Sequence, residues 1–354
     1  PMTAKRGLLE RLAQGPVICA EGFLFELERR GYCSAGEFVP EVALENPEAL
    51  RMLHRDFQRA GSDVVQAFTY NGHREKMRVI GKEDILEPLN RAALRIAKEV
   101  ADSNPSGEPD LMAGNISNTN IWNPDDPATH DDVRAMFREM CGWAAEEGAD
   151  MLIGETFYYR GEALAALEEM KRHDLPAVVT LGVMANGHML DGPTPGETCA
   201  ELERHGADVV GLNCFRGIPT FMPLLREVRE ACSGPVAALP LPYRTTCEHP
   251  TFFNLPDRAE CTCPAPHGRT FPTALDPLFM NRYEVRQWTE QAHAMGVQYL
   301  GLCCGNNPML TREVAEAVGR VTEASRFSER MQHHFMYGSH ERLPEHMKAQ
   351  GARA

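Results

Sequence analysis

The chain has 354 residues and a formal net charge of −14 at pH 7, which argues against nucleic acid or an anionic membrane surface as partners. Its hydrophobic share of 43% and charged share of 24% are typical of a globular protein with a sizeable core. No apolar run reaches the roughly 18 residues of a membrane span, and the first residues lack the apolar segment of a secretory signal. Eleven cysteines without the spacing of a disulfide framework predict reduced thiols in a cytoplasmic protein.

Eight short apolar runs recur along the chain, with helix-like segments between them. Most are β-branched or aliphatic without alternation, as expected of parallel strands that are buried on both faces. The segments between them have helical periodicity, and several end at a glycine directly before the next strand. The runs are 17–21, 63–68, 111–117, 151–157, 177–183, 208–214, 235–241 and 298–304. They predict an α/β fold, a (β/α)8 TIM barrel, in preference to an open doubly wound sheet, because no glycine-rich phosphate loop follows the first run.

Two segments do not follow this alternation of apolar runs and helical segments. Residues 243–280, rich in Pro, Thr and His, form a long predicted loop before the last helix, and loops of this length are usually functional or mobile. The barrel is predicted to occupy residues 5–325. Residues 326–354 then form a C-terminal tail, which could be an arm that packs on a partner subunit in a homo-oligomer. The long loop also contains potential ligands for a second, structural zinc: Cys247, His249, Cys261, Cys263 and His267.

Three cysteines fall at the C-terminal ends of predicted strands, where barrels of this kind carry their active sites. Cys214 closes the sixth run and the pair Cys303–Cys304 closes the eighth, and Gly305 allows the chain to turn so that both adjacent thiols face one ion. Three thiolates with a fourth position open predict a zinc ion that takes a soft sulfur ligand. An enzyme that activates a substrate thiol is therefore indicated. The cysteines with no such setting are expected to be ordinary buried residues: Cys19, Cys33, Cys141, Cys199 and Cys232.

Other polar residues share these strand ends. Glu155, at the end of the fourth run, would suit the ammonium group of a substrate, although an ordinary barrel-lining carboxylate is an equal alternative on residue type. Asn213 stands directly before Cys214 and is a second candidate for substrate binding. Further polar residues at these ends are Glu21, Gln66, Thr69, Tyr70, Asn115, Ser117 and Asn118.

Over roughly residues 5–325 the chain resembles the pterin-independent homocysteine S-methyltransferases, and most closely the members that use betaine. The segments that resemble the family are GLLERL, FLFELERRGY, LHRDFQRAGSDVVQAFTY, GVMANG, GLNC and GLCCGNNP. A single cysteine followed by a distant pair is the zinc signature of this family. The resemblance implies that Cys214, Cys303 and Cys304 ligate zinc, that the homocysteine sulfur binds this zinc, and that Glu155 holds its amino group. It also places the homocysteine carboxylate at backbone N–H groups near Glu21, Gly22 and Phe23.

The chain departs from the family pattern at two places. Ala20-Glu21-Gly22 stands where members usually read Asp-Gly-Gly, so Glu21 could supply the missing acid from one position along. Phe38 replaces a tryptophan of the betaine cage, and Asn71 and Thr156 replace tyrosines. Aromatic residues nearby could still surround an onium group by cation–π attraction, namely Phe68, Tyr70, Trp122, Phe157, Tyr158 and Tyr159.

The interpretation that follows is a zinc-dependent S-methyltransferase that moves a methyl group from a betaine-like onium donor to homocysteine and forms methionine. Its partners are then small-molecule substrates. A first alternative keeps the family but changes the donor to S-methylmethionine, dimethylsulfoniopropionate or proline betaine. A second is a non-catalytic zinc- and thiol-binding protein, which Glu21 would favour. A metal-dependent hydrolase barrel is disfavoured, because the strand ends lack the His and Asp ligands that it needs.

Overall fold

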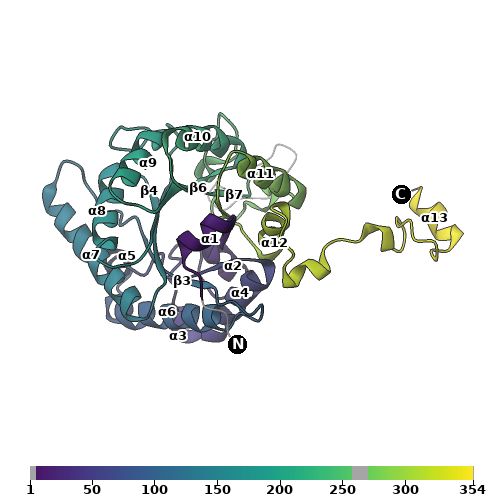
Figure 1. Cartoon of the computed structure of the whole chain (residues 1–354), viewed down its shortest axis with the longest axis horizontal. Helices are drawn as coiled ribbons and strands as arrows, with labels where there is room; N and C mark the ends of the chain where they lie inside the picture. The colour runs from purple at the N-terminus through teal and green to yellow at the C-terminus, as the bar shows by residue number, and fades with distance from the viewer. Residues whose placement is uncertain (1–4, 257–269, 354) are drawn as a thin grey trace.

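The computed structural model describes residues 5–256 and 270–353, in which eight parallel strands close into a barrel (Figure 1). Each strand pairs with the next one along the chain, and the eighth pairs with the first. The strands are β1 (Val17–Ala20), β2 (Val64–Gln66), β3 (Leu111–Ser117), β4 (Met151–Phe157), β5 (Ala177–Leu181), β6 (Val209–Gly217), β7 (Val236–Leu241) and β8 (Tyr299–Leu302). Seven of the predicted apolar runs contain one of them, and β6 begins in the run 208–214 and continues three residues past it. The predicted (β/α)8 barrel is confirmed.

Helices form a ring around the strands (Figure 1). Four of them have proline as their first residue, where its missing N–H costs nothing and its φ suits a helix. The ring comprises α4 (Pro47–Ala60), α6 (Leu86–Asp102), α7 (Pro127–Glu146), α8 (Arg160–Met170), α9 (Pro195–Arg204), α10 (Ile218–Ala231), α11 (Arg282–Ala294) and α12 (Pro308–Ala317). Shorter helices are α1 (Leu8–Gln14), α2 (Phe23–Arg29), α3 (Val42–Glu45), α5 (Arg74–Val79) and α13 (Glu345–Gly351). None of the helices in the described ranges has the length and apolar character that crossing a bilayer requires.

The interior of the barrel is apolar at one end and polar at the other. Leu8 and Leu12 of α1 belong to the same buried cluster as the inward-facing strand residues, and α1 lies across the centre of the ring (Figure 1). Inward side chains recur every second residue along a strand. Two residues beyond apolar Cys19 and Ile153 come Glu21 and Glu155, both buried. The next interior layer is therefore polar, at the ends of the strands where the predicted site residues fall.

The long segment 243–280 connects β7 to α11, and β8 and α12 follow it. Its two ends lie side by side, since Tyr243 forms an antiparallel bridge with Phe279. Phe252 and Leu275 from this segment pack in one buried cluster with Cys214 and the other cysteines at the mouth of the barrel. The described part of the segment thus covers the polar end of the barrel. Of the proposed second zinc ligands, Cys247 is exposed and His249 is partly exposed, while Cys261, Cys263 and His267 lie outside the described residues.

The C-terminal tail runs away from the barrel and ends in α13 (Figure 1). None of its described residues, 326–353, is buried. Large apolar side chains on it are open to solvent, with Phe335 83% and Phe327 61% exposed, and Tyr337 55%. An extended arm with this much exposed aromatic surface is suited to pack on another chain.

We expect residues 326–354 to act as an arm between subunits of a homo-oligomer. Deleting them should convert an oligomer to a smaller species while the barrel keeps its melting temperature, because the tail buries none of its described residues. Light scattering coupled to size-exclusion chromatography measures the mass, and circular dichroism measures the melting curve. A full-length protein that is already monomeric would contradict this role, as would a truncated protein of unchanged oligomeric state.

Candidate active site

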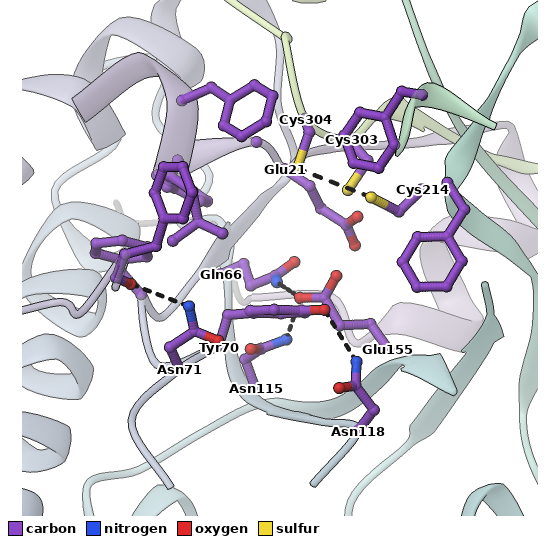
Figure 2. Close-up of a pocket in the computed structure, with 18 of the residues that line it drawn as sticks. Glu21, Gln66, Tyr70, Asn71, Asn115, Asn118, Glu155, Cys214, Cys303 and Cys304 are labelled. Carbon is purple, nitrogen blue, oxygen red and sulfur yellow. Dashed lines mark hydrogen bonds between the residues drawn. The ribbon is translucent and has the colours of Figure 1, made fainter. Parts of the chain in front are cut away.

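A layer of hydrogen-bonded polar side chains closes the interior of the barrel, and Glu155 of β4 lies at its centre (Figure 2). Its Oε1 accepts hydrogen bonds from Gln66 Nε2 and Asn115 Nδ2, each at 2.6 Å. Its Oε2 accepts one from Asn213 Nδ2 at 2.9 Å. Burial raises the pKa of the Glu155 carboxyl to about 7, although the amide donors oppose this shift. The carboxylate is thus fixed in position and sits at an energetic cost that a cation would relieve.

One acceptor in this layer has no partner among the described residues. Asn115 Oδ1 is buried without a hydrogen bond, although the Nδ2 of the same amide donates to Glu155. A buried acceptor without a donor costs about 1–3 kcal/mol, and a ligand N–H at this position would remove that cost. Both Asn115 and Glu155 line the large cavity at this end of the barrel. Together they offer a negative charge and a free acceptor to one ammonium group.

The three predicted metal-ligating cysteines converge at one wall of the same cavity. Cys214 lies in β6, and Cys303 and Cys304 come directly after β8. Their three Sγ atoms all lie within 4.8 Å of one another, and those of Cys214 and Cys304 are 3.8 Å apart (Figure 2). Two sulfurs on one tetrahedral zinc, each about 2.3 Å from the metal, are about 3.8 Å apart. The separation of Cys214 and Cys304 therefore matches that of two thiolates on one zinc ion, and the Cys303 sulfur lies close to both.

The charge state of this cluster also suits a metal. Burial opposes ionisation of Cys214, but hydrogen bonding with Cys303 and Cys304 prevails and holds the pKa of the Cys214 thiol well below its usual range. Burial raises the pKa of the Cys303 thiol, and hydrogen bonding with Cys214 raises the pKa of the Cys304 thiol. Hydrogen bonding within the cluster thus favours ionisation at Cys214, which burial opposes. Zinc replaces the protons of such thiols when it binds.

Irregular backbone turns these side chains toward the cavity. The pairing of β6 with β7 shifts between Asn213 and Gly217, and Cys214 and Phe215 have φ of 56° and 58°. Non-glycine residues seldom adopt such angles, which cost about 1–3 kcal/mol each. In the described residues, the non-glycine positions of positive φ all line the cavity or contact Glu155: Phe38, Asn120, Thr156, Cys214 and Phe215. Strain is thus concentrated at this one site.

The whole cavity has a volume of about 330 Å³, and the rest of its lining is largely aromatic. Tyr158 lies beside Phe215, with ring centroids 6.1 Å apart, and Phe215 meets Phe253 edge to face at 4.9 Å. Phe252 and Phe271 from the long segment add to this wall. The lining aromatic residues are Phe23, Phe25, Phe38, Phe68, Tyr70, Tyr158, Phe215, Phe252, Phe253 and Phe271. A cavity with acidic groups and thiols at one end and ring faces around it is suited to a cationic ligand.

Most residues predicted from the sequence meet at this cavity. Gly22, Phe23, Phe38, Asn71 and Tyr158 line it, and Asn71 Nδ2 donates to the Phe38 carbonyl at 3.1 Å. Thr156 and Asn213 belong to the polar layer beneath. The Oδ1 of Asn213 accepts from the Thr156 N–H at 2.9 Å, and its Nδ2 donates to Thr156 Oγ1 at 2.8 Å. These two residues hold Glu155 in place and do not themselves form the cavity wall.

Three of the predicted aromatic contacts lie elsewhere. Phe157 is fully buried outside the barrel, where its ring packs edge to face on Phe137 of α7. The expectation that Phe157 faces an onium group is wrong, because Thr156 with φ of 61° interrupts the alternation of β4 and turns the next side chain outward. Tyr159 precedes α8 and packs on the outer core, and Trp122 stacks on His130.

Some lining residues have no specific role that follows from the sequence. The sequence identifies Gln66 and Asn115 only as polar residues at strand ends, and Tyr70 also as an aromatic residue that could contact an onium group. Lys76 of α5 is the only lysine or arginine among the described lining residues. Its Nζ lies 3.2 Å from Ser117 Oγ and 4.5 Å from the centroid of the Tyr70 ring. Nothing in the sequence around Lys76 indicates that its side chain will reach a cavity.

Comparison with known proteins identifies the family of the chain. Residues 18–318 match the sequence model of the homocysteine S-methyltransferases. The chain belongs to the homocysteine S-methyltransferase family. The resemblance inferred from the sequence motifs is thereby confirmed.

Two relatives of this methyltransferase differ in the donor that their names state. A betaine–homocysteine S-methyltransferase from Xenopus tropicalis is 36% identical over 330 residues, which cover 89% of this chain and 76% of the relative. An S-methylmethionine–homocysteine S-methyltransferase from Pongo abelii is 35% identical over 323 residues, covering 88% and 81%. In fold, the metallated form of the homocysteine methyltransferase MmuM from Escherichia coli is similar, with a TM-score of 0.67 at 18% identity over 86% of this chain and 98% of that one.

Proposed function

We propose that the protein is a zinc-dependent methyltransferase that moves a methyl group from a betaine-like onium donor to the sulfur of homocysteine and so forms methionine. The observation that carries the proposal is the sulfur triad of Cys214, Cys303 and Cys304 beside an aromatic cavity. Relatives at 35–36% identity that are named for transfer to homocysteine support the acceptor. Because thiols must stay reduced to bind zinc, the proposal also fits the cytoplasmic location that the cysteine usage predicts.

Zinc suits the donor set of this chain. Three thiolates would hold the ion with one position free for a substrate sulfur. When bound, it supplies the Lewis acidity that keeps the homocysteine thiol deprotonated at neutral pH, and the electron-rich thiolate ligands leave that sulfur nucleophilic. No general base is then required from the protein for this proton. This agrees with a role for Glu155 as a fixed charge that binds substrate rather than as a group that accepts a proton.

The polar layer provides for the amino-acid part of homocysteine. Glu155 and the free Oδ1 of Asn115 would receive its ammonium group. Gly22 and Phe23 line the cavity where α2 begins, and the first N–H groups of a helix have no partner within the helix. Those groups would receive the homocysteine carboxylate. Both anchors would hold the sulfur at a fixed distance from the cysteine triad. Only an acceptor with the right number of carbon atoms between its amino-acid group and its thiol would then place the sulfur at the metal site.

The aromatic wall provides for the donor. Ring faces attract a quaternary ammonium or tertiary sulfonium. Unlike water, they contain no nucleophile that could accept its methyl group. Transfer requires the sulfur, the methyl carbon and the leaving nitrogen or sulfur to lie in line, so that the S–C bond forms as the old bond breaks. Opposite charges on donor and thiolate are neutralised in this step. A cavity that excludes water therefore favours the reaction.

A carboxylate-bearing donor is supported by Lys76. This side chain is the single cationic group of the described lining, and its Nζ contacts Ser117 and the Tyr70 carbonyl rather than an acid. Burial lowers the pKa of Lys76 to about 7, and an anion beside it would restore the charge. Betaine, S-methylmethionine, dimethylsulfoniopropionate and proline betaine all carry a carboxylate, whereas choline does not.

A donor screen tests the proposal. The zinc-loaded enzyme with homocysteine should form methionine from at least one carboxylate-bearing onium and at least about 10-fold more slowly from choline, since one hydrogen bond to a charged group contributes about 1.5–3 kcal/mol. Lys76→Met should lower this preference for the carboxylate while homocysteine binding is retained. Chromatographic detection of methionine provides the rate. Homocysteine binding without methyl transfer from any onium would identify a non-catalytic thiol-binding protein.

A further inference from the structure

A second carboxylate, that of Glu21, is buried beside the sulfur triad. Glu21 follows β1 directly and is 2% exposed. A carboxylate oxygen of Glu21, one of Glu155 and the Sγ of Cys303 all lie within 4.8 Å of one another. Figure 2 shows the Glu21 carboxylate between the three sulfurs and Glu155. Two clusters capable of holding a metal, one of three sulfurs and one of two acids and a sulfur, therefore share Cys303.

The backbone fixes Glu21 in this place. Its N–H donates to the Leu302 carbonyl at 3.2 Å, and Asn306 Nδ2 donates to its carbonyl at 3.1 Å. Gly22 has φ of 92°, and a Cβ there would come within 2.4 Å of the Cys303 carbonyl oxygen. The chain after β1 is thus packed directly against the turn that carries the cysteine pair. The nearness of the Glu21 side chain to Cys303 is built into the fold.

The Glu21 carboxyl has weaker partners than Glu155, namely the thiol of Cys303 and a shared amide of Asn213. Asn213 Nδ2 is 3.4 Å away, a long hydrogen bond, and that amide also donates to Glu155 at 2.9 Å. Burial raises the pKa of the Glu21 carboxyl well above its usual range, and the charge of Glu155 raises it further. Buried charges are normally paired or bound to a metal. Lys76, the only cation of the described lining, makes its contacts elsewhere.

We propose that Glu21 is the fourth zinc ligand of the resting enzyme and that the sulfur of homocysteine displaces it. Zinc accepts a carboxylate oxygen together with three thiolates, and the softer thiolate is the better ligand for a sulfur-rich site. In the exchange the zinc–oxygen bond breaks, the zinc–sulfur bond forms, and the thiol proton is released to water. The inference rests on the zinc site of the proposed function. It adds that the Glu21 carboxylate occupies the fourth coordination position of the zinc until homocysteine binds.

The alternative role for Glu21 is a second contact to the homocysteine ammonium. Replacing zinc with cobalt(II) distinguishes this role from that of a metal ligand. Cobalt reports its ligands in its visible spectrum. Glu21→Gln should change the spectrum of the resting protein, leave that of the homocysteine complex nearly unchanged, and bind homocysteine as tightly as wild type or more tightly, because a competitor is gone. Glu155→Gln is the matched comparison. It should leave the resting spectrum unchanged and weaken homocysteine binding.

An unchanged resting spectrum in Glu21→Gln, with weaker homocysteine binding, would overturn the ligand role and assign Glu21 to the ammonium. A measurement on the wild-type protein does not depend on any variant folding. A crystal structure of the zinc-loaded enzyme without homocysteine should show a Glu21 oxygen about 2.0–2.2 Å from zinc. Water in that position would refute the inference but leave the proposed function intact. A wild-type protein that binds no zinc would refute both.

Discussion

Replacing Cys214 with alanine is expected to remove the bound zinc and to reduce methyl transfer to homocysteine by at least about 1,000-fold, which corresponds to about 4 kcal/mol of transition-state stabilisation. Cys214 supplies the third sulfur of the cluster from β6, on a strand separate from the one that precedes Cys303 and Cys304. Without it, Cys303 and Cys304 would offer two ligands from one turn of the chain. Two adjacent thiolates are too few for a stable zinc site of this kind. Metal analysis of the purified protein and methionine formation provide the two measurements.

The matched control is Cys232→Ala. Cys232 is also buried, but it caps the end of α10, and burial raises the pKa of its thiol to about 11. This variant should keep its zinc and its turnover, with at most a modest loss of stability from the missing sulfur. Full turnover of Cys214→Ala without bound metal would refute the mechanism, because another group would then have to activate the thiol.

The barrel and its sulfur triad could be predicted because each rests on local pattern. Strands buried on both faces appear as short apolar runs, and Cys214, Cys303 and Cys304 stand where two such runs end. The residues of the polar layer also follow from a simple rule. Two positions beyond inward-facing Val64 and Ala113 come Gln66 and Asn115. Strand ends together with alternation therefore recover most of the polar half of the site.

The aromatic half could not be predicted in the same way. Phe157 was expected near the onium group as one of several aromatic residues close to the cage positions, but the left-handed φ of Thr156 interrupts the alternation of β4 and the Phe157 ring packs outside the barrel. Nothing in the residue type of a threonine signals such an angle. Phe252 and Phe271 reach the cavity from a segment without periodicity, through contacts between residues far apart in sequence. Such packing is decided by the assembled barrel and its covering segment.

Glu155→Gln is expected to separate recognition of the acceptor from binding of zinc. The change keeps the shape of the side chain but removes the charge that three amides hold in place. A hydrogen bond to a charged group contributes about 1.5–3 kcal/mol, so kcat/KM for homocysteine should fall about 10- to 100-fold. Most of the loss should appear in KM, because the ammonium is bound in the ground state and in the transition state alike. Zinc content should stay at the wild-type level.

An acceptor without the amino group provides the decisive comparison. 4-Mercaptobutanoate has the thiol and carboxylate of homocysteine but no ammonium, so it cannot use Glu155 or the free Oδ1 of Asn115. Wild-type enzyme should prefer homocysteine by about the same 10- to 100-fold, and Glu155→Gln should lose most of that preference. A variant that still prefers homocysteine as strongly as wild type would show that the ammonium binds elsewhere. Glu21 would then be the nearest other carboxylate, and the same pair of acceptors applied to Glu21→Gln would identify it.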